Sequence, residues 1–159
     1  FMATLADLNY FSGVSHPIQL VVADMLTDDE FVESFLEAAR DRLRHSYEIC
    51  IQKLEEMVVP YIPADAGMFV YVDFSSLLNK NSFEGEAELS ELIMKYARIV
   101  LTPGESQHER TPGMYRICFA FVTPEVLRVA MERLSKLVAK IRRMDWSDLN
   151  ENTLQSVLG

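Results

Sequence analysis

The sequence has few of the residues that build a disulfide scaffold, a fibrous repeat or a flexible tail. It contains 2 cysteines, 6 glycines and 6 prolines among 159 residues, and these proportions exclude disulfide-rich, collagen-like and low-complexity classes. Cys50 and Cys118 lie among apolar residues and have no Cys-x-x-Cys partner. We therefore expect two buried thiols in a reducing compartment, and no metal site.

Long apolar runs and basic clusters are also lacking. No run approaches the roughly 18 apolar residues that a membrane span needs, and the N-terminus lacks a signal-peptide layout. Lysine and arginine total 15 against 24 acidic residues, a net charge of −9 that repels nucleic acid and anionic lipid. We predict a cytoplasmic protein that binds neither nucleic acid nor membranes. Because the chain begins with Phe1 rather than methionine, we expect it to be a piece of a longer protein.

The first part of the sequence predicts two helices with apolar stripes. A capped helix is expected over residues 16–26. Thr27 and Glu30 have the spacing of a capping box, in which each side chain bonds the backbone of the other residue. This box is expected to begin a long second helix, which Pro60 ends.

Short runs of β-branched and aromatic residues predict three strands, over residues 68–74, 98–101 and 114–121. A third helix over residues 86–97 separates the first two strands, and a last helix begins at Thr123-Pro124. This order predicts an α+β fold with a small, mostly antiparallel sheet and helices over one face. Three strands are marginal alone, so the sheet is expected to lean on another domain.

The expected organisation is one domain over residues 1–143 and an accessory tail over residues 144–159. The tail is expected to hold a short helix near residues 149–157. Residues 104–113 form a polar loop about ten residues long, and loops of that length often carry function.

Arg116 is the only charged residue in its predicted strand. Alternation places Tyr115 and Ile117 on one face and Arg116 on the other. A guanidinium on an apolar surface must be solvated or paired, because burial of a lone cation is costly. An internal salt bridge, for instance to Asp73, is one solution. A ligand carboxylate bound by the planar fork of donors is the other.

The polar loop holds Ser106, His108 and Glu109 within four residues. Adjacent loop residues do not supply the geometry or the oxyanion hole of a catalytic triad, and one histidine with one glutamate is short of a metal site. A solvated loop is the favoured interpretation. His45 is expected on a solvated helix face, and His16 near a helix start.

Residues 66–73 and 115–120, together with the Pro103-Gly104 and Pro112-Gly113 turns and the last helix, resemble the C-terminal part of 1-aminocyclopropane-1-carboxylate synthases. These are pyridoxal-phosphate enzymes of the class I and II aminotransferase superfamily. The resemblance covers most of residues 1–142. It implies that this chain is the C-terminal small domain of a fold-type-I enzyme and that Arg116 binds the α-carboxylate of an amino-acid substrate.

The resemblance also implies that the lysine, the phosphate-binding residues and the aspartate that hold pyridoxal phosphate belong to an upstream domain. No lysine of this chain has the surroundings of a Schiff-base lysine, so no catalytic residue is assigned here and the isolated chain is expected to be inactive. The whole enzyme is expected to be a homodimer. The family usually has Trp-Phe where this chain has Met114-Tyr115, and tryptophan at Tyr71.

The reaction is open among three branches of this superfamily. A synthase-like enzyme is the main prediction, and an aminotransferase or a carbon–sulfur β-lyase is the alternative. A prediction of another class is a non-catalytic acidic module whose helices bind a partner. Arg116 distinguishes these classes, since such a module has no need of a lone arginine in a core strand.

Overall fold

The computed structural model describes residues 13–157, in two compact units that divide after Asp41. The first unit contains α2 (His16–Thr27) and the beginning of α3 (Asp29–Glu56). The helix predicted over residues 16–26 is therefore confirmed, and none of its residues is buried. The predicted domain over residues 1–143 and the predicted tail over residues 144–159 each extend beyond the described residues, because residues 1–12 and 158–159 are not described.

The junction between α2 and α3 differs from the predicted capping box. Thr27 is the last residue of α2, and its hydroxyl donates to the Ala23 carbonyl at 3.0 Å. The carboxylate of Asp28 accepts the N–H of Phe31 at 3.0 Å and thereby caps α3. The prediction of Thr27 as the cap was wrong because its hydroxyl bonds back into the preceding turn, which leaves the cap to its acidic neighbour.

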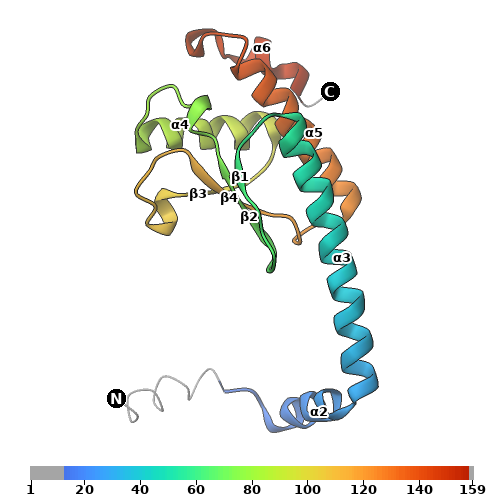
Figure 1. Ribbon diagram of the computed structural model, residues 1–159. Coiled ribbons are helices and arrows are strands. Elements are labelled where there is room, and N and C mark those ends of the chain that lie inside the picture. Colours follow the sequence, from blue (N-terminus) through green and yellow to red (C-terminus); the bar gives the residue numbers. More distant parts are fainter. Residues whose placement is uncertain (1–12, 158–159) are drawn as a thin grey trace, which may run out of the picture. The chain divides into compact units, whose positions relative to one another are not determined.

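The second unit is built around a four-stranded antiparallel sheet in the order β1-β2-β4-β3 (Figure 1). Its strands are β1 (Tyr61–Ile62), β2 (Phe69–Asp73), β3 (Thr102–Pro103) and β4 (Met114–Cys118). β2 and β4 lie at the centre and pair over the full length of both strands. The predicted α+β class with a small antiparallel sheet is confirmed.

Three details of the sheet were predicted wrongly. The strand predicted over residues 114–121 ends at Cys118. Residues 98–101 are irregular, and pairing with β4 begins only at Thr102. Arg98 has φ 58° where it follows the π-helical segment η2 (Ile93–Ala97), and a left-handed residue cannot belong to an extended run. The short strand β1, which was not predicted, adds a fourth strand beside β2.

One face of the sheet packs against helices. Val72 of β2 and Tyr115 of β4 are fully buried there with Leu134 of α5 (Pro124–Ile141). The third helix, α4 (Phe83–Leu92), continues into η2 and begins three residues earlier than predicted. Figure 1 shows α4, α5 and the second half of α3 around the strands. This arrangement confirms the predicted helix layer over one face of the sheet.

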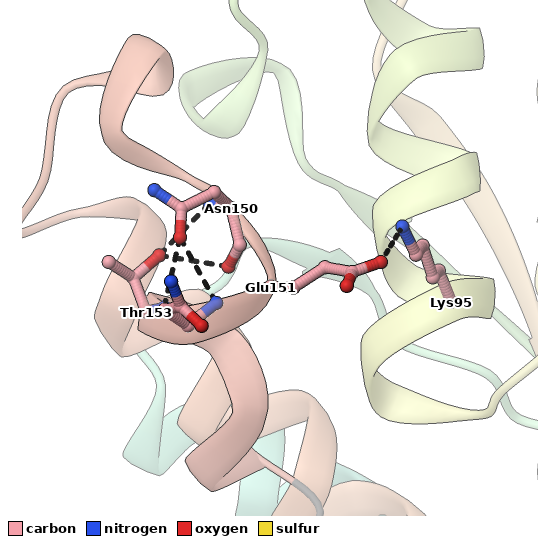
Figure 2. A network of polar contacts seen from close by, with 5 residues as sticks. Lys95, Asn150, Glu151 and Thr153 are labelled. Carbon is pink, nitrogen blue, oxygen red and sulfur yellow. Dashed lines mark hydrogen bonds and ion pairs between the residues drawn. The ribbon is translucent and has the colours of Figure 1, made fainter.

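The segment after residue 143 packs on the same core through Leu154 and Val157, both fully buried. Asn150 caps α6 (Glu151–Leu154), and Glu151 forms an ion pair with Lys95 at 2.8 Å (Figure 2). Both side chains of this pair are exposed, so it contributes little to stability. The predicted short helix is confirmed, whereas the boundary at residue 143 stays a prediction. Between residues 13 and 157, no helix has both the length and the apolar character to cross a membrane.

Candidate functional site

β4 has two chemically different faces. Tyr115 and Ile117 point into the core, as the alternation predicted, while Met114, Arg116 and Cys118 are half-buried on the opposite face. The core face is filled by helices, so its polar groups must find partners within the protein. The face with Arg116 is the candidate site.

Arg116 lies between two neighbouring strands. Its register partners are Tyr71 on β2 and Thr102 on β3, and register partners share one face of a sheet. The guanidinium carbon lies 4.4 Å from the ring centroid of Phe69, a distance at which a cation–π interaction holds the planar group over the aromatic face. Phe69 therefore orients the guanidinium.

Arg116 has no ionic partner within the described residues, and its Nε is buried without a hydrogen bond. Asp73, the internal partner considered above, lies opposite Met114 and accepts the N–H of Ser75 at 2.8 Å. A buried donor without a partner costs about 1–3 kcal/mol, and more when it is charged. Among the described residues, the guanidinium therefore has the aromatic support of Phe69 and no acceptor for its Nε–H group.

A buried carboxylate on α4 holds the loop that precedes β4. Glu86 is 1% exposed, and its two oxygens accept the N–H groups of Glu105 at 3.0 Å and Gly113 at 2.6 Å. These two donors stand near the beginning and at the end of the loop over residues 104–113. One side chain thus fixes both ends of the loop and the start of β4.

Backbone and core contacts also hold the end of this loop and the start of β4. Gly113 has φ 97°, and a Cβ there would lie 2.5 Å from the Cα of Ser75, so only glycine fits. The Tyr115 hydroxyl donates to the Glu86 carbonyl at 2.6 Å and also bonds Ser90 at 2.9 Å. Burial raises the pKa of Tyr115 to about 12. Tyr115, which precedes Arg116, is therefore held by the burial of its ring and by the two hydrogen bonds of its hydroxyl.

Within the loop, Ser106, His108 and Glu109 do not form a triad. The Ser106 hydroxyl donates to the Pro103 carbonyl at 2.8 Å, and His108 is exposed with φ 60°. No hydrogen bond joins the three side chains in the described part of the chain. His45 is likewise exposed, as predicted, and contacts Arg128 at 3.2 Å.

Glu109 reaches Tyr71, the register partner of Arg116. The Tyr71 hydroxyl lies 3.4 Å from Glu109 Oε2, while Oε1 accepts the N–H groups of Arg110 at 2.7 Å and Thr111 at 3.3 Å. These backbone donors hold the pKa of Glu109 below its usual range. Burial, and then the charge of Glu109, raises the pKa of Tyr71. An anionic carboxylate and a protonated phenol therefore lie beside the candidate site.

The lysines do not resemble a cofactor-binding amine. Lys53 lies 2.6 Å from Glu56 and 3.1 Å from Glu132, and these hydrogen bonds raise its pKa. Lys140 donates to the Thr153 carbonyl at 2.5 Å. An amine whose pKa is raised, as in Lys53, is a poor nucleophile. None of the lysines is among the buried residues, so the desolvated amine expected for a Schiff base is not found among residues 13–157.

The two cysteines differ in their surroundings. Cys50 is fully buried, and desolvation raises the pKa of its thiol to about 12. Cys118 is only half-buried and lies on the face with Arg116. The prediction of a buried thiol is therefore confirmed for Cys50 and wrong for Cys118, because alternation in β4 turns Cys118 away from the core.

Sequence reasoning missed Glu86 and the contact between Tyr71 and Glu109. A signal for the former was present: Glu86, Leu89 and Ile93 are spaced as one helix face, and all three are buried. The Tyr71–Glu109 contact joins residues 38 positions apart. Local patterns contain no signal for such a contact.

The sequence of this chain is similar to those of a known protein family. The family model described as aminotransferase class I and II matches residues 1–134. The 1-aminocyclopropane-1-carboxylate synthase 7 of Arabidopsis thaliana is 31% identical over 140 residues, which cover 88% of this chain and 31% of that protein. The chain therefore spans about a third of the length of the curated relatives it matches.

Solved structures show the same fold. The aromatic aminotransferase of Pyrococcus horikoshii superposes with a TM-score of 0.69 at 23% identity, over 80% of this chain and 32% of that chain. YbdL of Escherichia coli, for which a methionine aminotransferase function is described, gives a TM-score of 0.64 at 26% identity, over 80% and 32%. Together these matches confirm the predicted fold of the small domain.

Replacing Glu86 tests whether its carboxylate holds the loop. In Glu86→Ala both N–H groups lose a charged acceptor, and we expect hydrogen exchange at Glu105 and Gly113 to accelerate about 10- to 100-fold. In Glu86→Gln one acceptor oxygen remains, so one of these amides should stay protected. Exchange is measured by NMR or by mass spectrometry of short peptides.

The matched control is Glu88→Gln, because Glu88 lies on the same helix and bonds only the Asn79 side chain among its described contacts. This variant should leave exchange at Glu105 and Gly113 unchanged. Unaltered protection of both amides in Glu86→Ala would show that the loop is held by other contacts.

Proposed function

Because the chain belongs to the class I and II aminotransferase family, we propose that it is the substrate-binding C-terminal domain of a pyridoxal-phosphate enzyme that acts on amino acids. In this proposal Arg116 binds the α-carboxylate of the substrate. The observation that carries it is the guanidinium of Arg116, which forms no ion pair with any described residue and whose buried Nε has no acceptor among residues 13–157.

A carboxylate fits the surroundings of Arg116. A guanidinium presents its donors in a plane, and a carboxylate accepts two of them side by side. Phe69 supports one face of that plane, so the rotational freedom of the side chain is already reduced before a ligand arrives. A preorganised donor pair binds its acceptor with a smaller loss of entropy.

The residues of this chain do not fit the cofactor itself. Pyridoxal phosphate supplies an electron sink for the substrate Cα, and it requires a lysine that this part of the protein does not present in a desolvated state. We therefore propose that an upstream domain of a longer protein holds the cofactor. The homodimer expected for the whole enzyme belongs to the same proposal.

The contribution of this domain is to orient the substrate and to limit access of water. Arg116 fixes one end of the amino acid, and fixed orientation lowers the entropic part of a reaction barrier. The loop over residues 104–113, held by Glu86 at both ends, borders the same sheet face through Glu109 and Tyr71. In our proposal this loop lies at the entrance of the site.

A synthase-like reaction is the main candidate, because 1-aminocyclopropane-1-carboxylate synthases are among the relatives at 31–34% identity. An aminotransferase is the second candidate, and the family description and the fold of YbdL favour it. A carbon–sulfur β-lyase remains a further alternative. The non-catalytic acidic module does not account for a charged, unpaired strand residue.

Replacing Arg116 tests the carboxylate site. In a protein that carries this chain with its cofactor domain, Arg116→Ala should weaken amino-acid binding by about 1.5–3 kcal/mol or more, the range for hydrogen bonds to charged groups. Cofactor occupancy should stay unchanged, and binding of an amino-acid amide should hardly change. Affinity is measured by calorimetric titration.

Arg110→Ala is the matched control, since Arg110 is an exposed cation in the neighbouring loop. It should leave affinity for amino acids within a factor of about two if only Arg116 binds the carboxylate directly. Equal losses for the acid and its amide in Arg116→Ala would contradict the assignment.

The reaction type is tested by three incubations of a longer protein that carries this chain with its cofactor domain and is loaded with pyridoxal phosphate. The substrates are S-adenosylmethionine, an amino donor with a 2-oxo acid, and a cysteine conjugate. We expect product from the first, and the 159-residue chain alone should bind no stoichiometric pyridoxal phosphate and form no product. Product from the second incubation only would replace the synthase proposal with the aminotransferase one.

A further inference from the structure

Three groups on the site face form a connected set. Arg116 on β4 is the register partner of Tyr71 on β2, and the Tyr71 hydroxyl contacts the Glu109 carboxylate of the loop at 3.4 Å. Tyr71 therefore links the two charged residues: it shares a sheet face with Arg116 and its hydroxyl contacts Glu109. They form no ion pair with each other within the described residues.

Glu109 is held in place without Arg116. One of its oxygens accepts two successive backbone N–H groups, from Arg110 and Thr111, and the other contacts Tyr71. Three donors toward one carboxylate favour its charged form. The negative charge is therefore fixed beside the site before any ligand enters, and it leaves the guanidinium of Arg116 available.

We propose that Glu109 is a specificity-determining residue that disfavours amino acids with a second carboxylate, and that Tyr71 positions it. This inference rests on the proposed function, because it requires a ligand carboxylate on Arg116. A ligand bound there lies beside Tyr71, and an acidic side chain on that ligand would approach a fixed negative charge. Repulsion of this kind is a common way for a site to reject a wrong ligand.

A purely structural role for Glu109 makes a different prediction. If the carboxylate served only to tether the loop to β2, a neutral acceptor in its place would preserve the tether and leave ligand preference unchanged. Glu109→Gln separates the two roles, because its amide oxygen still accepts from Tyr71 or from the backbone while the charge is removed.

The experiment compares isosteric ligands, L-glutamate against L-glutamine and L-aspartate against L-asparagine, bound to the cofactor-loaded protein. Dissociation constants come from equilibrium titration. We expect Glu109→Gln to narrow the preference for the amide over the acid by about tenfold, since repulsion at a half-buried site is partly screened. The change should come from tighter binding of the acid, with the amide constant within about twofold of its original value.

Two further variants complete the test. Tyr71→Phe removes the hydroxyl that contacts Glu109. It should narrow the preference for the amide over the acid less than Glu109→Gln does. Glu105→Gln is the matched control, because Glu105 is an exposed acid of the same loop whose backbone N–H, rather than its side chain, is bound by Glu86. It should leave the preference unchanged.

Each result decides the proposal. Equal effects of Glu109→Gln on the acids and on the amides, or an equal narrowing by Glu105→Gln, would overturn the role of Glu109 while the carboxylate site on Arg116 stands. If Arg116→Ala leaves the affinities for all four amino acids unchanged, the proposed function itself fails.

Discussion

The carboxylate of Glu86 is the contact on which the candidate site depends. A buried carboxyl group must be satisfied by hydrogen bonds, and Glu86 accepts them from the N–H groups of Glu105 and Gly113. Because both donors belong to the loop before β4, satisfying the carboxyl group also fixes the loop. The side chain of Glu86 thereby links α4 to both ends of the loop and to the start of β4.

Within the described residues, the two faces of β4 differ in burial: Tyr115 and Ile117 are buried on the core face, and Arg116 is half-buried on the other. On the core face, the Tyr115 hydroxyl has two partners, Glu86 and Ser90, as expected for a buried polar group. On the other face, Arg116 has an aromatic support, and its Nε has no acceptor among the described residues. This contrast supports the proposal that Arg116 binds an anion.

Periodicity sufficed for those parts of the fold that depend on local pattern. The apolar stripe of α5 and the alternation in β4 identified the core side of each element, and Arg116 emerged as the odd residue of its strand. In α3 the predicted stripe is buried only at Cys50 and Leu54, whereas Leu36 is exposed. The strand expected over residues 98–101 failed because Arg98 takes a left-handed conformation, which no alternation pattern reports.

The site was less predictable than the fold because its key contacts are long-range. Glu86 binds residues 19 and 27 positions away, and Tyr71 contacts Glu109 across 38 positions. Such pairs depend on the register of β2 with β4 and on the path of the loop. The role proposed for Arg116 rests on resemblance to a family, since spacing alone favoured an internal salt bridge, for instance to Asp73.

The account is tested most directly by the NMR signal of the Arg116 Nε–H group. The cofactor-loaded protein is labelled with 15N-arginine, the signal is assigned with Arg116→Lys, and an amino acid is titrated. We predict that the Arg116 signal shifts and its hydrogen exchange slows as the carboxylate binds, while the Arg110 signal stays unchanged. An Arg116 signal that does not respond to saturating amino acid would contradict a carboxylate site at this residue.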